Sequence, residues 1–169
     1  MVALSDGQEE LEKFLIFQLG EEDFGLPIAS IDEVVRVPGD ITRVPGAPSF
    51  VRGLMNLRGR AIALVDQRQR FDFSGSAGGA NARAIVLTLD GVQAAFVVDR
   101  ISEVKAFSRS ELSAAPEFSS DRAEVFDRVA HVGAAGTMIL LIDPRELLTR
   151  TEQDAVAAIS ASDTVGISR

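Results

Sequence analysis

Short runs of alternating apolar residues are the feature that most restricts how this chain can fold. Five such runs are aliphatic or β-branched and are bounded by Gly, Asp or Pro: FLIFQL (14–19), AIALV (61–65), AIVLTL (84–89), AAFVV (94–98) and MILLI (138–142). A period of two places the apolar side chains on one face of a strand, so each run predicts a short strand. Many short strands predict an all-β protein built as a small barrel or a sandwich.

The second half of the chain repeats the pattern of the first half. A shift of about 70 positions aligns residues 17–34 with 87–104, and Glu33 then matches Glu103. A slightly larger shift aligns residues 59–71 with 136–148, again with identical residues at several positions. Internal similarity of this kind changes a fold prediction, and here it indicates one β-rich unit that is present twice.

The repeat divides the chain into two expected subdomains. The first is expected at about 14–71 and the second at about 84–148, joined by a linker at 72–83 that is rich in Gly, Ser and Ala. A flexible polar segment, 1–13, precedes them. The sequence leaves open whether strands exchange between the two subdomains.

A C-terminal helix is expected at the end of the second unit. Asp143 is followed by proline and, three positions on, by an acidic residue, which is typical of a helix N-terminus. We predict a helix over 144–161 and a tail over 162–169. Asp66 has the matching position in the first unit, so we interpret both aspartates as caps rather than as catalytic carboxylates.

The composition excludes most kinds of catalytic and metal site. The 169 residues include no cysteine and a single histidine, His131, which rules out disulfides, thiolate nucleophiles and the usual metal sites. The glycine-rich stretch lacks the Lys-Ser/Thr of a phosphate-binding loop, and no serine lies in a nucleophile elbow. We therefore expect no enzymatic activity, no metal and no cofactor, and we interpret His131 as a strand residue.

Arginines are concentrated in one segment of an acidic chain. The formal net charge is −8, yet residues 41–71 contain six arginines against one acidic residue. Arginine is favoured in interfaces and in bidentate recognition of carboxylates, which favours a protein-binding surface over a merely solvated face. A small RNA-binding β-barrel that uses Arg43–Arg70 is the alternative. Such barrels usually interleave exposed aromatic residues, and this chain has no Trp and no Tyr.

Arg58 is the arginine that the repeat distinguishes. From Gly59 onward the first unit has a counterpart in the second, but the preceding residues NLR (56–58) align with GAA (133–135). The repeated architecture therefore does not require Arg58, and we expect this side chain to contact a partner.

The order of these segments resembles the CheW family of chemotaxis coupling proteins. The similarity covers about residues 14–148 and includes RVPGAPSFVRGLMNLRG at 43–59, which is close to the most diagnostic segment of the family. The resemblance implies two packed, five-stranded, SH3-like β-barrels, in agreement with the repeat. It also implies a non-enzymatic adaptor that couples the cytoplasmic tips of methyl-accepting chemoreceptors to the regulatory domain of the histidine kinase CheA.

The resemblance further implies two binding surfaces. The receptor-binding groove between the barrels maps to Ile31, Glu33, Arg52, Gly53, Asn56, Arg58, Val98, Ile101 and Val104. The kinase-binding end maps to Ile41, Arg43, Val44 and Phe50. In the groove, aliphatic side chains would supply affinity, while Arg58 and Glu33 would fix the register of a receptor helix through charged hydrogen bonds.

Four positions depart from the family pattern and leave the choice of partner open. Ala63 and Gln67 stand where the family usually has proline and leucine, Arg100 stands where it tends to have a small residue, and the segment around Ala130 lacks an expected glycine pair.

The location of the protein follows from what its sequence lacks. The chain has no secretory signal and no apolar run near the ~20 residues that span a bilayer. We expect a cytoplasmic protein, monomeric when isolated, that is recruited to membrane-associated receptor arrays without inserting into the membrane or binding nucleic acid.

Overall fold

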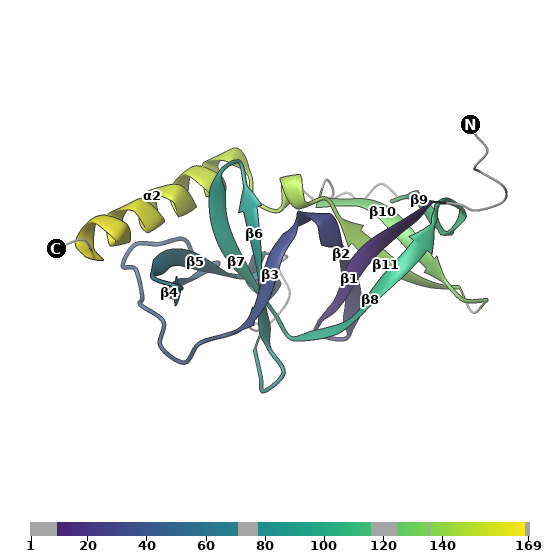
Figure 1. Ribbon diagram of the computed structural model, residues 1–169, viewed down its shortest axis with the longest axis horizontal. Coiled ribbons are helices and arrows are strands. Elements are labelled where there is room, and N and C mark those ends of the chain that lie inside the picture. Colours follow the sequence, from purple (N-terminus) through teal and green to yellow (C-terminus); the bar gives the residue numbers. More distant parts are fainter. Residues whose placement is uncertain (1–9, 71–77, 116–124, 135, 168–169) are drawn as a thin grey trace.

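The computed structural model describes residues 10–70, 78–115, 125–134 and 136–167, and these form two β-sheets side by side and a C-terminal helix (Figure 1). The first sheet has the strand order β8-β1-β2-β11-β10-β9, with β1 (Leu11–Leu19), β2 (Glu22–Pro27), β8 (Arg100–Ser108), β9 (Leu112–Ala114), β10 (Phe126–Val132) and β11 (Thr137–Ile142). The second has the order β3-β6-β7-β5-β4, with β3 (Ile31–Arg36), β4 (Val51–Leu57), β5 (Arg60–Asp66), β6 (Arg83–Leu89) and β7 (Val92–Val98).

This architecture confirms the all-β prediction. The second sheet has the expected five strands, and the first has a sixth because the short β9 adds to its edge. The expected segments 1–13 and 72–83 lie partly outside the described residues.

Each sheet takes strands from both halves of the chain. The β1–β2 hairpin pairs with β8 and β11, and the matching β6–β7 hairpin pairs with β3 and β5. The strand exchange that the sequence left open is therefore present, and the two sheets do not coincide with segments 14–71 and 84–148. Sequence similarity identifies the repeated unit, whereas hydrogen bonds between strands decide which unit completes which sheet.

The chain crosses between the sheets at two equivalent places. The first crossing is the 3-10 turn Ile28–Ser30, after which β3 begins, and the second is Asp99, after which β8 begins. Thus β3 and β8 are the third strands of their respective units, and each leaves the sheet of its own hairpin to join the other sheet.

The main hydrophobic core is formed mostly by the strands of the second sheet and extends to β1, β2 and β11 of the first sheet. Strand β1 is buried on both faces, since Leu15, Phe17 and Leu19 pack into this core while Phe14 and Ile16 pack into a smaller cluster within the first sheet. The alternate side chains of β1 therefore point into two different hydrophobic clusters, and neither face of the strand is exposed to solvent there. This arrangement ties the sheets into one folded body.

The C-terminal helix begins later than expected. Asp143 does act as a cap, because its carboxylate accepts the Arg145 N–H at 3.0 Å, but it caps only the 3-10 turn Pro144–Glu146. Helix α2 runs from Arg150 to Ile167 and starts with a capping box, in which the Thr149 hydroxyl and the Glu152 carboxylate accept each other's backbone N–H. The signal T-x-x-E, rather than Asp-Pro, marks this N-terminus.

Asp66 caps the counterpart turn, as predicted. Its Oδ1 accepts the backbone N–H groups of Arg68 and Gln69 at 3.0 and 3.3 Å, in the short helix α1 (Gln67–Arg70).

None of the described helices is long and apolar enough to cross a membrane.

Candidate partner-binding site

Arg58 lies in an unusual backbone conformation at the tip of a hairpin. Arg58 and Gly59 form the two-residue turn between β4 and β5, with φ of +51° and +84°. Two-residue turns with positive φ match the twist of the strands, but their first residue is usually Asn, Asp or Gly. Asp90, for example, is the first residue of the two-residue turn between β6 and β7. Asn56 supports the turn by accepting the Gly59 N–H at 2.7 Å. An arginine with positive φ is uncommon, and strain of this kind concentrates at functional sites.

The Arg58 side chain is held by a bidentate ion pair with Glu33 on β3. The two guanidinium nitrogens donate to the two carboxylate oxygens at 2.5 and 2.6 Å. The hydrogen bond from Arg58 lowers the pKa of Glu33 below its ordinary value, and Glu33 raises the pKa of Arg58. The Arg58 side chain is 72% exposed and that of Glu33 25%. A pair this exposed adds little to stability, so its effect is to orient the guanidinium at the surface.

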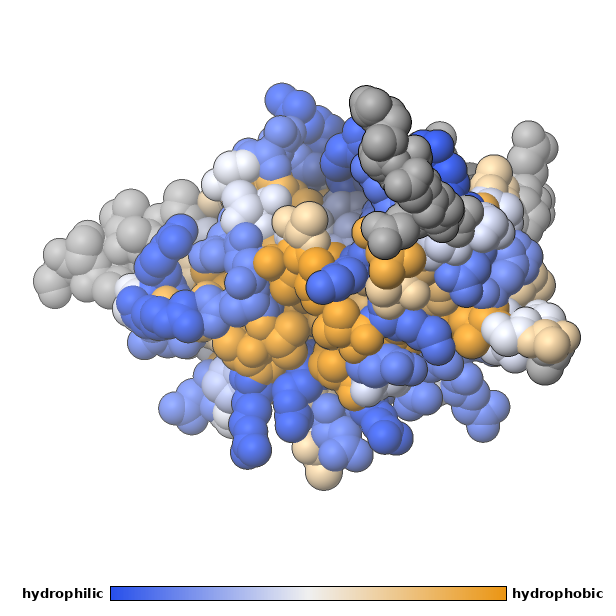
Figure 2. Space-filling model, turned by 45° about the vertical axis from the view of Figure 1, so that its right-hand side comes forward, coloured by the Kyte–Doolittle hydropathy of each residue, from blue (hydrophilic) through white to orange (hydrophobic). Residues whose placement is uncertain are grey.

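Apolar side chains are exposed on the two strands that cross between the sheets. Val34 on β3 is 38% exposed and Val104 on β8 is 54% exposed. Ile31 and Ile101, one on each strand, are half-buried against the main core. Figure 2 shows apolar side chains gathered at the middle of one face of the molecule, with hydrophilic side chains around them. Exposed aliphatic residues on β3 and β8, together with the charged pair that Glu33 of β3 makes, are features suited to binding an amphipathic partner.

Arg52 and Gly53 on β4 serve the scaffold beneath this surface. Arg52 donates to the buried Asp66 carboxylate through Nε and Nη2 at 3.2 and 3.1 Å, and the same carboxylate caps α1. Gly53 has φ +149°, and a Cβ there would overlap the carbonyl oxygen of Thr42. This close approach allows Thr42 and Leu54 to exchange backbone hydrogen bonds of 2.9 and 2.7 Å.

Val98 does not reach the surface in this structure. It ends β7, which lies inside the second sheet between β6 and β5, and its side chain is fully buried in the main core. The resemblance therefore placed a core residue in the receptor-binding set, because sequence similarity identifies a position on a strand but not the face that it presents.

The residues expected at the kinase-binding end lie in the loop 37–50 between β3 and β4. Ile41, Val44 and Phe50 are half-buried against the main core, and Arg43 is exposed. The bridge between Thr42 and Leu54 fixes this loop on the edge strand β4.

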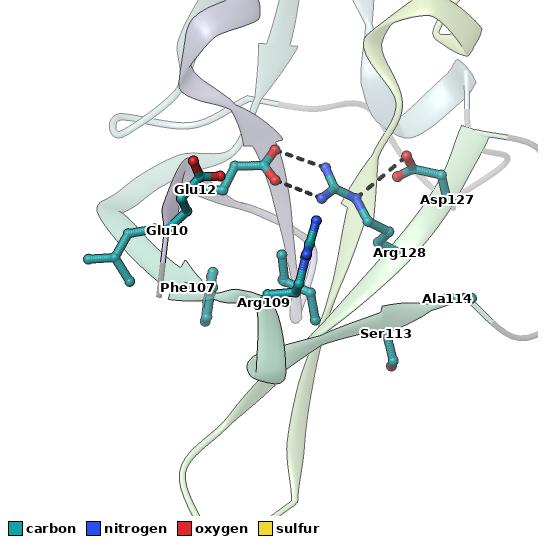
Figure 3. Close-up of a pocket in the computed structure, with 10 residues that line it drawn as sticks. Glu10, Glu12, Phe107, Arg109, Ser113, Ala114, Asp127 and Arg128 are labelled. Carbon is teal, nitrogen blue, oxygen red and sulfur yellow. Dashed lines mark hydrogen bonds and ion pairs between the residues drawn. The ribbon is translucent and has the colours of Figure 1, made fainter. Parts of the chain in front are cut away.

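A third surface feature had no signal in the sequence. At one end of the first sheet, the guanidinium of Arg128 on β10 donates to Glu12 on β1 at 2.7 and 3.0 Å (Figure 3). The same guanidinium lies 5.4 Å from the ring centroid of Phe14. Burial raises the pKa of the neighbouring Asp127, while the hydrogen bond from Arg128 lowers that of Glu12. Glu12 and Arg128 are 116 positions apart, so only the fold brings them together.

The described residues contain no candidate metal centre. Among them, no group of three or more His, Asp or Glu side chains could hold a metal ion. The Ser113 hydroxyl lies 2.8 Å from Nε2 of His131, which is a hydrogen bond between adjacent strands with both side chains exposed.

Residues 13–152 match the model of the CheW-like domain family. The chain belongs to this family. The chemotaxis protein CheW of Klebsiella aerogenes is 32% identical over 157 residues, which cover 92% of this chain and 93% of that protein. Protein FrzA of Myxococcus xanthus is 27% identical over 147 residues, which cover 86% of this chain and 91% of that protein.

Solved structures agree with this CheW-like assignment. The crystal structure of the scaffolding protein TtCheW from Thermoanaerobacter tengcongensis superposes with a TM-score of 0.75 at 27% identity, and the match covers 85% of this chain and 92% of that one. The CheW-like family comprises non-catalytic chemotaxis scaffolds, and none of the relatives named here is described by an enzymatic activity.

Proposed function

We propose that this CheW-like protein couples the cytoplasmic tips of chemoreceptors to the regulatory domain of the histidine kinase CheA. The observation that carries the proposal is the Arg58–Glu33 pair, which is oriented at the surface on a strained turn that the repeated architecture does not require. The exposed aliphatic residues of β3 and β8 support it. Binding to receptor tips would bring the protein to membrane-associated arrays.

Each part of the receptor surface has a distinct role in this proposal. A helical receptor tip presents an apolar stripe with polar flanks, and Val34 and Val104 would bury part of that stripe. Arg58, held by Glu33, would donate its remaining N–H groups to a polar group on the helix and so fix the register. The loop 37–50 would bind the kinase domain, leaving β3 and β8 for the receptor.

The arginine distribution gives less support to the RNA-binding alternative. Of the arginines between 41 and 71, at least three are paired with carboxylates: Arg52 with Asp66, Arg58 with Glu33, and Arg68 with Asp99. Paired guanidinium groups have less charge to offer to phosphates.

Reconstitution tests the proposal directly. Purified protein should co-sediment with receptor tips of its own organism and raise CheA phosphorylation in their presence. Incubated with ATP alone, without the kinase, it should not hydrolyse the nucleotide. Val104→Asp should weaken tip binding, whereas Leu11→Asp, at a residue that is 63% exposed on β1, is the matched control and should not. Failure of the wild-type protein to bind any tip and any CheA regulatory domain would overturn the proposal.

A further inference from the structure

Three arginines lie near the end of β3 and have no carboxylate partner among the residues that the structure describes. Arg36 on β3 lies directly opposite Arg83 on β6 in the antiparallel register. Arg83 and Arg100, the first residue of β8, line a hollow of about 170 Å³ together with Asn81 and Ile101. We refer to Arg36, Arg83 and Arg100 as the arginine triad.

The triad is uncompensated within the described part of the chain. Arg83 Nη1 donates to the carbonyl oxygen of Ala82 at 2.8 Å, and no carboxylate of the described residues lies within ion-pairing distance of any member. By contrast, Arg52, Arg58 and Arg68 each have such a partner. Like charges directly opposite one another in a ladder are destabilising, so the sheet gains nothing from the pairing of Arg36 with Arg83. A cost of this kind, in a protein of net charge −8, points to a binding role.

The triad adjoins the surface proposed for the receptor. Ile101, which lines the hollow, also packs at the edge of the main core, and Arg36 lies two residues beyond the exposed Val34 on the same strand. A helix that covers the apolar residues of β3 and β8 would therefore bring its polar flank close to the three guanidinium groups.

We propose that the arginine triad selects receptor tips that carry carboxylates beside their apolar stripe. This inference rests on the proposed function and names a specificity element for it. Guanidinium groups bind carboxylates in a bidentate manner, and the hollow has room for a carboxylate and a few waters at about 30 Å³ each.

Charge reversal at the triad tests the inference. Recombinant tips of the organism's own receptors are titrated calorimetrically with wild-type protein, Arg36→Glu and Arg100→Glu, at 50 and 500 mM NaCl. Arg109→Glu is the matched control, since Arg109 is exposed, has no ion-pair partner among the described residues, and lies one 9-residue strand away, about 30 Å from Arg100.

The expected result is a selective, salt-dependent loss of affinity. For tips with acidic flanks, Arg100→Glu and Arg36→Glu should bind about tenfold more weakly at low salt, and the difference should shrink at high salt. Arg109→Glu should bind like the wild type. Glutamate-to-lysine substitution on the tip should restore binding to Arg100→Glu, and Arg36→Glu should melt no lower than the wild type because it removes a like-charge pair.

The outcomes separate this inference from the proposed function. If tips bind the wild type and all three variants equally, the triad has no role in recognition while the coupling function stands. If no tip binds the wild type, both fail. A single-stranded RNA oligonucleotide is tested in the same way. If it binds the wild type and loses affinity for Arg100→Glu, while receptor tips bind both proteins equally, the triad recognises nucleic acid and the proposal that it recognises acidic receptor tips is wrong.

Discussion

Gln67 should weaken the fold that carries these surfaces. Its side chain is fully buried in α1, and among the described residues neither its Nε2 nor its Oε1 has a hydrogen-bond partner. Leaving a buried polar group unsatisfied costs about 1–3 kcal/mol relative to an apolar group of the same shape. Gln67→Met keeps the unbranched path of the side chain and removes both polar atoms, so we expect it to raise the free energy of unfolding by about 1–3 kcal/mol.

This prediction is measured by urea denaturation and, in parallel, by thermal denaturation. The urea midpoint should rise with an unchanged m-value, and Tm should rise by about 2–10 °C for a domain of this size. Gln67→Leu should also stabilise, by less if its branch crowds the site. Gln69→Met, at an exposed residue of the same helical turn, should change stability by no more than ~0.5 kcal/mol.

One result would refute the reasoning. If Gln67→Met and Gln67→Leu both lower the free energy of unfolding by more than about 1 kcal/mol, then the amide makes favourable contacts in solution that offset its burial. The Gln67 account would then be wrong.

Three further predictions concern the turn, the loop and the acidic end of the first sheet. Arg58→Ala should leave Tm nearly unchanged but weaken receptor binding; unfolding instead would show that Arg58 is structural. Gly53→Ala should destabilise by more than ~1 kcal/mol in urea unfolding, because it combines a positive φ with overlap onto Thr42, and an unchanged midpoint would contradict this close approach. Burial raises the folded-state pKa of Asp127, so its charged form opposes folding above that pKa and the penalty disappears as pH falls below the unfolded value. Asp127→Asn should therefore raise Tm at pH 7 but not at pH 3, and an equal gain at both would exclude a charge effect.

Local signals predicted the elements of this fold well. The period-2 runs mark real strands, and the repeat correctly pairs the β1–β2 hairpin with β6–β7. Asp66 was predicted as a cap from its position alone, because a cap needs only backbone N–H groups two and three residues away. The start of α2 was missed because two capping signals, at Asp143 and Thr149, lie six residues apart and local sequence does not rank them.

The candidate site was predictable only in part. Arg58 and Glu33 were expected on one surface and do form a pair, but their bidentate geometry depends on the fold bringing Glu33 of the edge strand β3 close to the turn after the opposite edge strand β4. Val98 was assigned to the receptor-binding groove, while the position of β7 inside the second sheet, between β6 and β5, buries it in the main core. Arg83 had no sequence signal at all, since its significance depends on the register that places it opposite Arg36.

The sequence by itself determined the strands, their doubling and the family, because each of these depends on residues close together in the chain. The tertiary structure alone decided which strands share a sheet, which side chains are buried, and which charges find partners. Those properties depend on contacts between residues tens of positions apart, such as Glu12 with Arg128 and Glu33 with Arg58. A period of two shows that successive side chains point to opposite faces of a strand. Only the pairing of that strand with its neighbours decides whether each face is buried or exposed.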